Sequence, residues 1–120
     1  MNIIKDFMST PILSIDVNAS AEETAKEMLK EGVSCLLVHE KENFVGIITE
    51  KDLVRRVIAK ERDAKNIKTH SVMSKPIITM DHYLSRSDAN ILMQRKKIKH
   101  LVVTEHKKPV GILTPKDMIT

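Results

Sequence analysis

Two threonine–aspartate pairs are the residues in this chain whose types and spacing could support chemistry. The pattern Gly, two apolar residues, Thr, two residues, Asp occurs at residues 46–52 and again at residues 111–117. In each copy an apolar run ends at the threonine, and a helix is expected to begin directly after it. The threonine hydroxyl and the first free N–H groups would then lie at the positive end of a helix dipole, which favours a phosphate group.

The aspartate of each pair would lie in the first helical turn. Its carboxylate could accept two hydrogen bonds from a ribose diol, as acidic residues do in other nucleotide sites. The same residues also suit ordinary helix capping, with threonine at the N-cap, aspartate at N3 and Pro115 at N1 of the second copy. Each motif alone leaves both interpretations open, and their repetition at an equal offset favours ligand binding.

Both copies belong to an internal repeat with an offset of 65 residues. It aligns Met-Ser-Thr-Pro-Ile at residues 8–12 with Met-Ser-Lys-Pro-Ile at residues 73–77. Sixteen of the 45 aligned positions from 8 to 52 are identical, where unrelated segments would share roughly 3. Capping requires neither the Met-Ser-x-Pro-Ile segment nor the glycines of the motif, so the repeat indicates a common function.

The first repeat predicts alternating strands and helices. Ser20 and Glu23 form a capping box, and the helix that follows ends at Gly32. The apolar runs 35–38 and 44–48 flank a polar turn at 40–43, which predicts an antiparallel hairpin with a five-residue-class loop and strands buried on both faces. A second amphipathic helix is expected from about Glu50. The apolar positions at helical spacing are Ala21, Ala25, Met28 and Leu29 in the first helix, and Leu53, Val54, Val57 and Ile58 in the second.

The second repeat predicts the same order, beginning with Ser85 and Asp88 at a helix cap and ending in a helix of scarcely more than one turn. The fold class is therefore α/β of the α+β type, with two βαββα repeats paired through their sheets by a pseudo-twofold axis and a ligand cleft between them. Repeat one spans 1–60, a linker 61–68 and repeat two 69–120, together one compact module. The short final helix indicates either a truncated sequence or an apolar edge, near Met118 and Ile119, that a partner subunit covers.

Composition narrows the function classes. With 42% hydrophobic and 30% charged residues and no apolar run near bilayer length, the 120-residue chain is expected to be soluble and cytoplasmic. Cys35, the only cysteine, lies in an apolar run and is interpreted as a small buried hydrophobe. Histidine spacing predicts no metal site. The net charge of +4 is uneven, with residues 1–60 carrying 8 basic and 10 acidic groups and residues 61–120 carrying 12 and 6.

The chain resembles the CBS domain, named after cystathionine β-synthase, in the order of three segments. They are residues 6–12, then, after a predicted helix, residues 34–38 and 46–52, and the whole order is repeated at the offset of 65. The resemblance covers nearly the whole chain and implies a stand-alone tandem CBS pair. It further implies dimerisation, often into a flat disc, and two clefts that bind adenosine nucleotides such as AMP, ADP or ATP, or S-adenosylmethionine.

The resemblance also assigns site residues. Thr49 and Thr114 would contact phosphate, and Asp52 and Asp117 the ribose. Backbone flanking the adenine ring would come from Thr10, Pro11, Ile12, Lys75, Pro76 and Ile77. The entrance of the central strands would supply Ser34, Cys35, Lys99 and His100, so the two clefts should differ in charge, with His100 as a pH-sensitive phosphate contact. Basic residues near the cleft mouths are Lys51, Lys116, Arg55 and Arg56; they are candidate phosphate contacts, although a solvated helix face would look the same. Lys96, Lys97, Lys107 and Lys108 are expected to be solvent-exposed.

The function that follows is a regulatory, ligand-sensing module that transmits nucleotide binding to an unidentified effector protein. It is expected to be a homodimer, to need no cofactor and not to be an enzyme, since nothing resembles a nucleophile–base pair or a Gly-rich phosphate loop. A structural dimerisation module without ligand is the alternative. Nucleic-acid binding through the basic second half is weaker, because aromatic residues make up only 2% of the chain.

Overall fold

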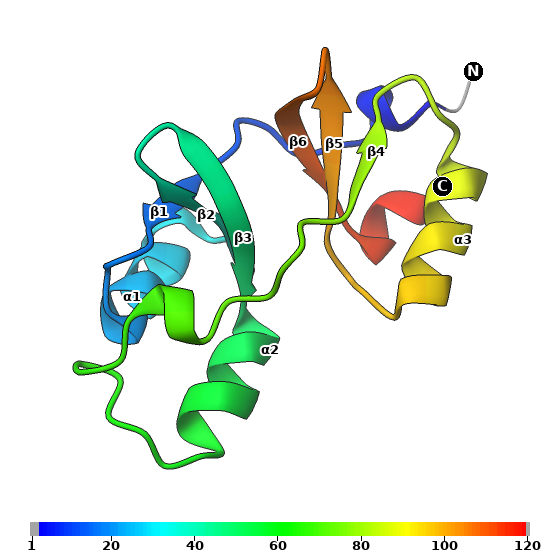
Figure 1. The fold of residues 1–120 in the computed structure, drawn as a ribbon. Helices are drawn as coiled ribbons and strands as arrows, with labels where there is room; N and C mark the ends of the chain where they lie inside the picture. Colours follow the sequence, from blue (N-terminus) through cyan, green and yellow to red (C-terminus); the bar gives the residue numbers. More distant parts are fainter. Residues whose placement is uncertain (1–2, 120) are drawn as a thin grey trace. The chain divides into compact units, whose positions relative to one another are not determined.

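The computed structural model describes residues 3–119 and contains two three-stranded sheets with flanking helices (Figure 1). The chain divides into two compact units. We call residues Leu13–Ile77 the central unit, and the segments up to Ile12 and from Ile78 onward the terminal unit. This mixed composition of strands and helices, in the same order twice, confirms the predicted fold class.

The central unit begins with its edge strand and ends with a short 3-10 turn. Its strands are ordered β1-β2-β3, with β1 parallel to β2 and β2 antiparallel to β3. Its elements are β1 (Ser14–Asp16), α1 (Ala21–Glu31), β2 (Cys35–Glu40), β3 (Asn43–Thr49), α2 (Glu50–Leu53), the π-helical turn η2 (Val54–Ile58) and the 3-10 turn η3 (Thr69–Ser71).

The terminal unit repeats this plan. Its strands are ordered β4-β5-β6, with β4 parallel to β5 and β5 antiparallel to β6. Its elements are η1 (Ile4–Asp6), β4 (Thr79–Asp81), α3 (Arg86–Lys96), β5 (Leu101–Glu105), β6 (Lys108–Leu113) and the 3-10 turn η4 (Pro115–Met118). The final helix is as short as the sequence predicts.

Local sequence signals account for the helix ends. The Ser20 hydroxyl accepts a hydrogen bond from the N–H of Glu23, and the Glu23 carboxylate accepts one from the N–H of Ser20. The predicted capping box is therefore confirmed. Gly32 ends α1 in the left-handed region, with φ 67°. Ser85 caps α3 by accepting the N–H of Asp88. Each cap fixes where its helix begins, and hence which side faces the sheet.

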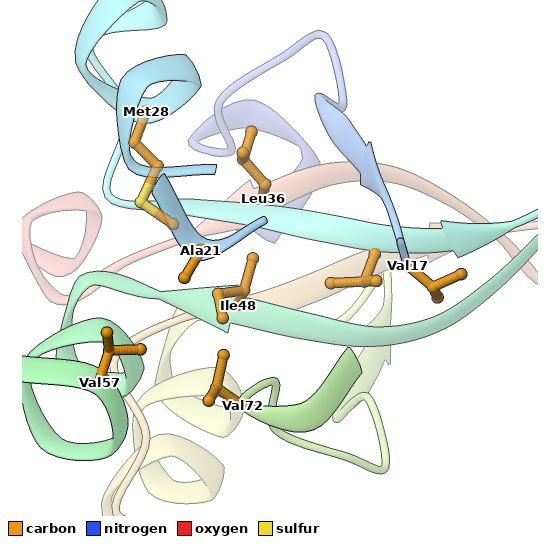
Figure 2. Close-up of a cluster of buried hydrophobic side chains, with 8 residues drawn as sticks. Val17, Ala21, Met28, Leu36, Ile48, Val57 and Val72 are labelled. Carbon is orange, nitrogen blue, oxygen red and sulfur yellow. The ribbon is translucent and has the colours of Figure 1, made fainter. Parts of the chain in front are cut away.

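The core of the central unit lies between the sheet and its helices. Figure 2 shows Met28 and Ala21 of α1 close to Leu36 and Ile48 of the strands, with Val57 completing the contact from η2. The predicted burial of the central strands is confirmed for residues 35–38 and 46–48, whereas Phe44 at the start of β3 is exposed and Val45 is half-buried. A second cluster, centred on Leu101, Val103, Leu113, Ala89 and Met93, plays the same part in the terminal unit.

Two details of the sequence prediction were wrong. The β2–β3 hairpin closes through Lys41 and Glu42 alone, since Glu40 pairs with Asn43, so its loop is shorter than the five-residue class. The apolar positions of the helices are also not all in the core. Leu29 of α1 is 85% exposed, and Val54 and Ile58 of η2 are 54% and 70% exposed. Helical spacing identifies apolar residues on one side of a helix, but it does not show whether another part of the protein covers them.

The repeats exchange their first segments. Backbone hydrogen bonds in both directions join Ser9 to Ile112 of β6, and Ser74 to Ile47 of β3. The Met-Ser-x-Pro-Ile segment of each repeat therefore lies beside the Gly-to-Asp motif of the other. In Figure 1 this places the blue N-terminal segment with the strands of the terminal unit. None of the described helices is long and apolar enough to cross a membrane.

Candidate functional site

In the central unit, Thr49 and Asp52 lie where β3 ends and α2 begins. The Asp52 Oδ2 atom accepts the N–H of Thr49 at 2.9 Å and its hydroxyl at 3.1 Å, while the Asp52 N–H is 3.2 Å from the Thr49 hydroxyl oxygen. The N–H of Glu50 donates to the carbonyl of Ser34 at 3.0 Å. The motif thus forms a closed capping box, and the Thr49 hydroxyl is engaged within it.

The second oxygen of Asp52 is held by the segment from the other repeat. Ser74 donates its hydroxyl to Asp52 Oδ1 at 2.8 Å, and Arg56 Nε lies 4.0 Å from the same oxygen. Arg56 also donates to the carbonyls of Val72 and Met73, at 3.2 and 2.8 Å. Because Asp52 is only 6% exposed, these contacts place a satisfied carboxylate in the protein interior.

The glycine of the motif has a separate structural reason. A Cβ atom at Gly46 would lie 2.6 Å from the sulfur of Met73 and 3.0 Å from the carbonyl oxygen of Ser74. In the terminal unit a Cβ at Gly111 would collide with the sulfur of Met8. Each methionine therefore packs directly on a glycine of the other repeat, and a side chain at either glycine would force that methionine to shift.

We call the Thr–Asp capping box at the end of β3 or β6, together with the segment from the other repeat, a corner. The corner of the terminal unit has fewer contacts than that of the central unit. Asp117 Oδ2 accepts the N–H of Thr114 at 2.8 Å and its hydroxyl at 3.2 Å. Ser9, the counterpart of Ser74, is exposed, and within residues 3–119 its hydroxyl makes no hydrogen bond. The Oδ1 atom of Asp117 consequently has no protein donor in this described range, and Asp117 is half-buried where Asp52 is buried.

A buried arginine supports the terminal corner in another way. Arg86, at the start of α3, donates to the carbonyl of Asp117 at 3.1 Å, and its guanidinium carbon lies 3.8 Å from the centre of the Phe7 ring. Sequence reasoning did not identify Arg86, Phe7, Ser74 or the two methionines. The signal for Ser74 and the methionines was present in their identity between repeats, whereas Arg86 aligns with Ala21 and carries no repeat signal.

The remaining predicted site residues divide between the two units. In the central unit Thr49 and Asp52 lie with Ser34 and Cys35, which open β2, and with the segment of Lys75, Pro76 and Ile77. In the terminal unit Thr114 and Asp117 share a unit with Thr10, Pro11, Ile12, Lys99 and His100. The cations Lys51, Arg55, Arg56, Lys99 and Lys116 are exposed, and so are the four lysines expected to be solvated. Each aspartate thus shares its unit with the Met-Ser-x-Pro-Ile segment of the other repeat.

Cys35 is buried, and desolvation raises the pKa of its thiol from 9.0 to about 12. This confirms its interpretation as a small buried hydrophobe. Among the residues that the structure describes, no three His, Cys, Asp or Glu side chains gather in a way that could hold a metal ion.

Comparison with known proteins identifies the family of both repeats. The family model described as the CBS domain matches residues 4–59 and again residues 67–120. The chain belongs to the CBS domain family. An uncharacterized protein of Methanopyrus kandleri, MK0525, is 34% identical over 102 residues, covering 83% of this chain and 52% of that protein. The CBS domain-containing protein YhcV of Bacillus subtilis is 28% identical and covers 98% of this chain and 84% of its own length. The chain thus spans about half of the first relative and most of the second.

Solved CBS proteins share the fold. An uncharacterized protein from Pyrococcus horikoshii has a TM-score of 0.92 at 28% identity, covering 98% of this chain and 89% of its own. A hexameric CBS-CP12 protein from bloom-forming cyanobacteria has a TM-score of 0.90 at 24% identity, and the match covers 99% of this chain and 70% of that protein's chain. The CBS protein PAE2072 from Pyrobaculum aerophilum, solved with AMP, has a TM-score of 0.85 at 24% identity, covering 96% and 88%. CBS pairs are regulatory modules, one of these neighbours binds AMP, and stand-alone CBS proteins are generally not catalytic.

Proposed function

We propose that this CBS pair is a regulatory module that binds an adenine nucleotide (AMP, ADP or ATP) or S-adenosylmethionine and transmits this binding to an effector protein. One observation supports this most directly. In each unit a Thr–Asp corner is assembled with a Met-Ser-x-Pro-Ile segment taken from the other repeat. A cap that only closed a helix would not need this exchange, whereas a ligand that contacts both segments would stabilise their association.

The ribose would be bound by the aspartate oxygen that is not used for capping. In the terminal unit this is Asp117 Oδ1, which is open within the described residues. In the central unit Asp52 Oδ1 already accepts from Ser74, so a ribose hydroxyl would share it. The charge of each unit also favours binding at the terminal corner. The terminal unit carries 9 basic and 5 acidic residues, whereas the central unit carries 11 of each. An anionic nucleotide should therefore bind more tightly at the terminal corner.

Calorimetric titration with AMP, ADP, ATP, S-adenosylmethionine and NAD tests the proposal. We expect at least one adenine nucleotide to bind, and Asp117→Asn to weaken it about 10-fold or more, as the loss of a charge-assisted hydrogen bond does. Lys116→Ala should weaken ATP more than AMP, and the matched control Lys107→Ala, an exposed lysine of the β5–β6 turn, should change neither. No heat and no thermal stabilisation with any of the five would instead favour a structural module without ligand.

We also propose that the module is a homodimer; self-association is known for this fold, because the CBS-CP12 neighbour is a hexamer. A dimer could transmit nucleotide binding, because a structural change at each corner can alter how the two copies pack or which surface is available to an effector protein. The mass in solution, with and without nucleotide, tests this part separately.

A further inference from the structure

Two methionines lie at the contact between the exchanged segments and the strands of the corners. The Met8 side chain lies across Gly111 of β6, because a Cβ atom at that glycine would be 2.7 Å from Met8 Cγ and closer still to the Met8 sulfur. Met73 lies across Gly46 of β3 in the same way, with its sulfur 2.6 Å from the corresponding Cβ position. The serine that follows each methionine makes the backbone hydrogen bonds to the strand. Each sulfur therefore lies beside the bonds that join its segment to the corner.

These methionines combine close packing with partial exposure. Met8 and Met73 are half-buried and pack against the apolar clusters of their units, whereas Met28 and Met93 lie inside those clusters and are 4% exposed. A small oxidant dissolved in water can thus reach the first pair more readily than the second. Cys35 is a poor competitor, because burial raises the pKa of its thiol to about 12 and the thiolate is the reactive form.

Oxidation of a methionine by a peroxide is a single oxygen transfer. A sulfur lone pair attacks one oxygen of hydrogen peroxide, the S–O bond forms as the O–O bond breaks, and the second oxygen leaves as water with both protons. The sulfur loses two electrons and the peroxide gains them. The product, methionine sulfoxide, is polar and carries one more heavy atom than the thioether. Against glycine backbone and an apolar cluster, that group should make the side chain withdraw from the strand.

The two corners should respond differently, because their segments are held differently. In the central unit, side-chain hydrogen bonds from Ser74 and Arg56 tie the segment to α2 and η2. In the terminal unit, within the part of the chain that the structure describes, the hydrogen bonds between residues 8–12 and β6 are two backbone bonds joining Ser9 to Ile112. Loss of the methionine contact therefore removes a larger share of what holds the terminal segment to its strand.

We propose that Met8 and Met73 are sites of reversible oxidation by peroxides, and that the sulfoxide of Met8 detaches residues 8–12 from β6 and so weakens ligand binding at the terminal corner. The effect on ligand rests on the proposed nucleotide binding, whereas the oxidation and the detachment do not. Methionine sulfoxide reductases, which return sulfoxide to thioether, would restore the corner.

Peptide mapping by tandem mass spectrometry tests the sites. The full chain with Cys35→Ala, which removes the only thiol, is treated with increasing hydrogen peroxide and quenched with free methionine. We expect sulfoxide at Met8 and Met73 at doses that leave Met28 and Met93 unmodified. Oxidation of all four at one rate, or of the core pair first, would overturn the assignment.

Amide hydrogen exchange tests the detachment without any ligand. After oxidation, exchange at the N–H groups of Ser9 and Ile112 should accelerate about 10-fold or more, because both are bonded only while the segment is attached. Met8→Leu, which keeps an apolar side chain of similar volume, should prevent most of this change. Met80→Leu is the matched control, because Met80 is half-buried against the same cluster but lies on β4, away from the segment. Equal protection by the two variants would refute the detachment.

Calorimetric titration with AMP and with ATP tests the link to binding. Met8→Gln places a polar side chain of similar length at this position without peroxide, so it should lower the affinity on the order of 10-fold. Met80→Gln is its control and should bind as the parent does. Unchanged affinity in Met8→Gln would refute the link between oxidation and binding. No heat from the parent with either nucleotide would count against the proposed function and this last step, and amide exchange would still decide the rest.

Discussion

Replacing Ser74 with alanine should weaken the central unit by a measurable amount. The change removes one hydroxyl, which donates to Asp52 Oδ1 at 2.8 Å, and leaves nearly the same volume. Asp52 is buried, so water cannot readily replace the lost donor. A hydrogen bond to a charged group contributes about 1.5–3 kcal/mol, and Asp52 keeps its other donors at Oδ2 when the Ser74 hydroxyl is lost. We therefore expect the free energy of unfolding to fall by about 2 kcal/mol.

Urea unfolding followed by circular dichroism measures this loss. With an m-value of about 2 kcal/mol per M, the midpoint should move down by about 1 M urea. Ser9→Ala is the matched control, because Ser9 occupies the equivalent repeat position with an exposed hydroxyl that has no hydrogen bond in the described residues. Its effect should stay within about 0.5 kcal/mol.

A double-mutant cycle with Asp52→Asn identifies the partner. If the Ser74 hydroxyl acts through the carboxylate, the two substitutions should be coupled by about 1 kcal/mol or more. Equal effects of Ser74→Ala and Ser9→Ala, or strictly additive effects of Ser74→Ala and Asp52→Asn, would refute the assignment of this hydrogen bond as the link between the segment and α2.

Two further predictions concern the glycines and the buried thiol. Gly46→Ala places a methyl group against Met73 and should lower the free energy of unfolding by about 1–3 kcal/mol through overpacking. Gly32→Ala has open space around it but a φ of 67°, so it should cost about 1 kcal/mol through backbone strain alone. In urea unfolding, an added Met73→Ala substitution should reduce the loss caused by Gly46→Ala and leave the loss caused by Gly32→Ala unchanged. Burial raises the pKa of Cys35 from 9.0 to about 12, so the unfolded chain releases this proton first. The free energy of unfolding should be insensitive to this thiol below about pH 9 and fall between pH 9 and 12. Cys35→Ala should lack that part of the decrease, and an identical pH profile for both proteins would contradict the burial argument.

Much of the fold was predictable because local signals and the repeat agree. The caps at Ser20 and Ser85, the stop at Gly32 and the buried strands follow from residue types whose local preferences match the final structure. The short final helix followed directly from the alignment of the repeats. Such features depend on interactions between residues close in sequence.

The composition of each corner was not predictable in the same way. Nothing local shows that Ser74 contacts Asp52, 22 residues earlier, or that Met8 packs on Gly111 at the opposite end of the chain. An internal alignment reports which residues are equivalent, but not which equivalent copy a segment contacts. Leu29, Val54 and Ile58 illustrate a related limit, since apolar periodicity does not distinguish a residue in the core from one on an exposed helix face.

The exchange of first segments has a consequence for the origin of this chain. A single ancestral repeat, carrying its own Met-Ser-x-Pro-Ile segment, could complete its Gly-to-Asp corner only by receiving that segment from a second molecule. Two such molecules could exchange segments reciprocally, and joining two copies end to end gives one chain in which each repeat receives its segment from the other. Residues 13–77 hold every part of one corner, whereas neither sequence repeat does. A cut after Ile77 would therefore preserve the building block that a cut between the repeats destroys.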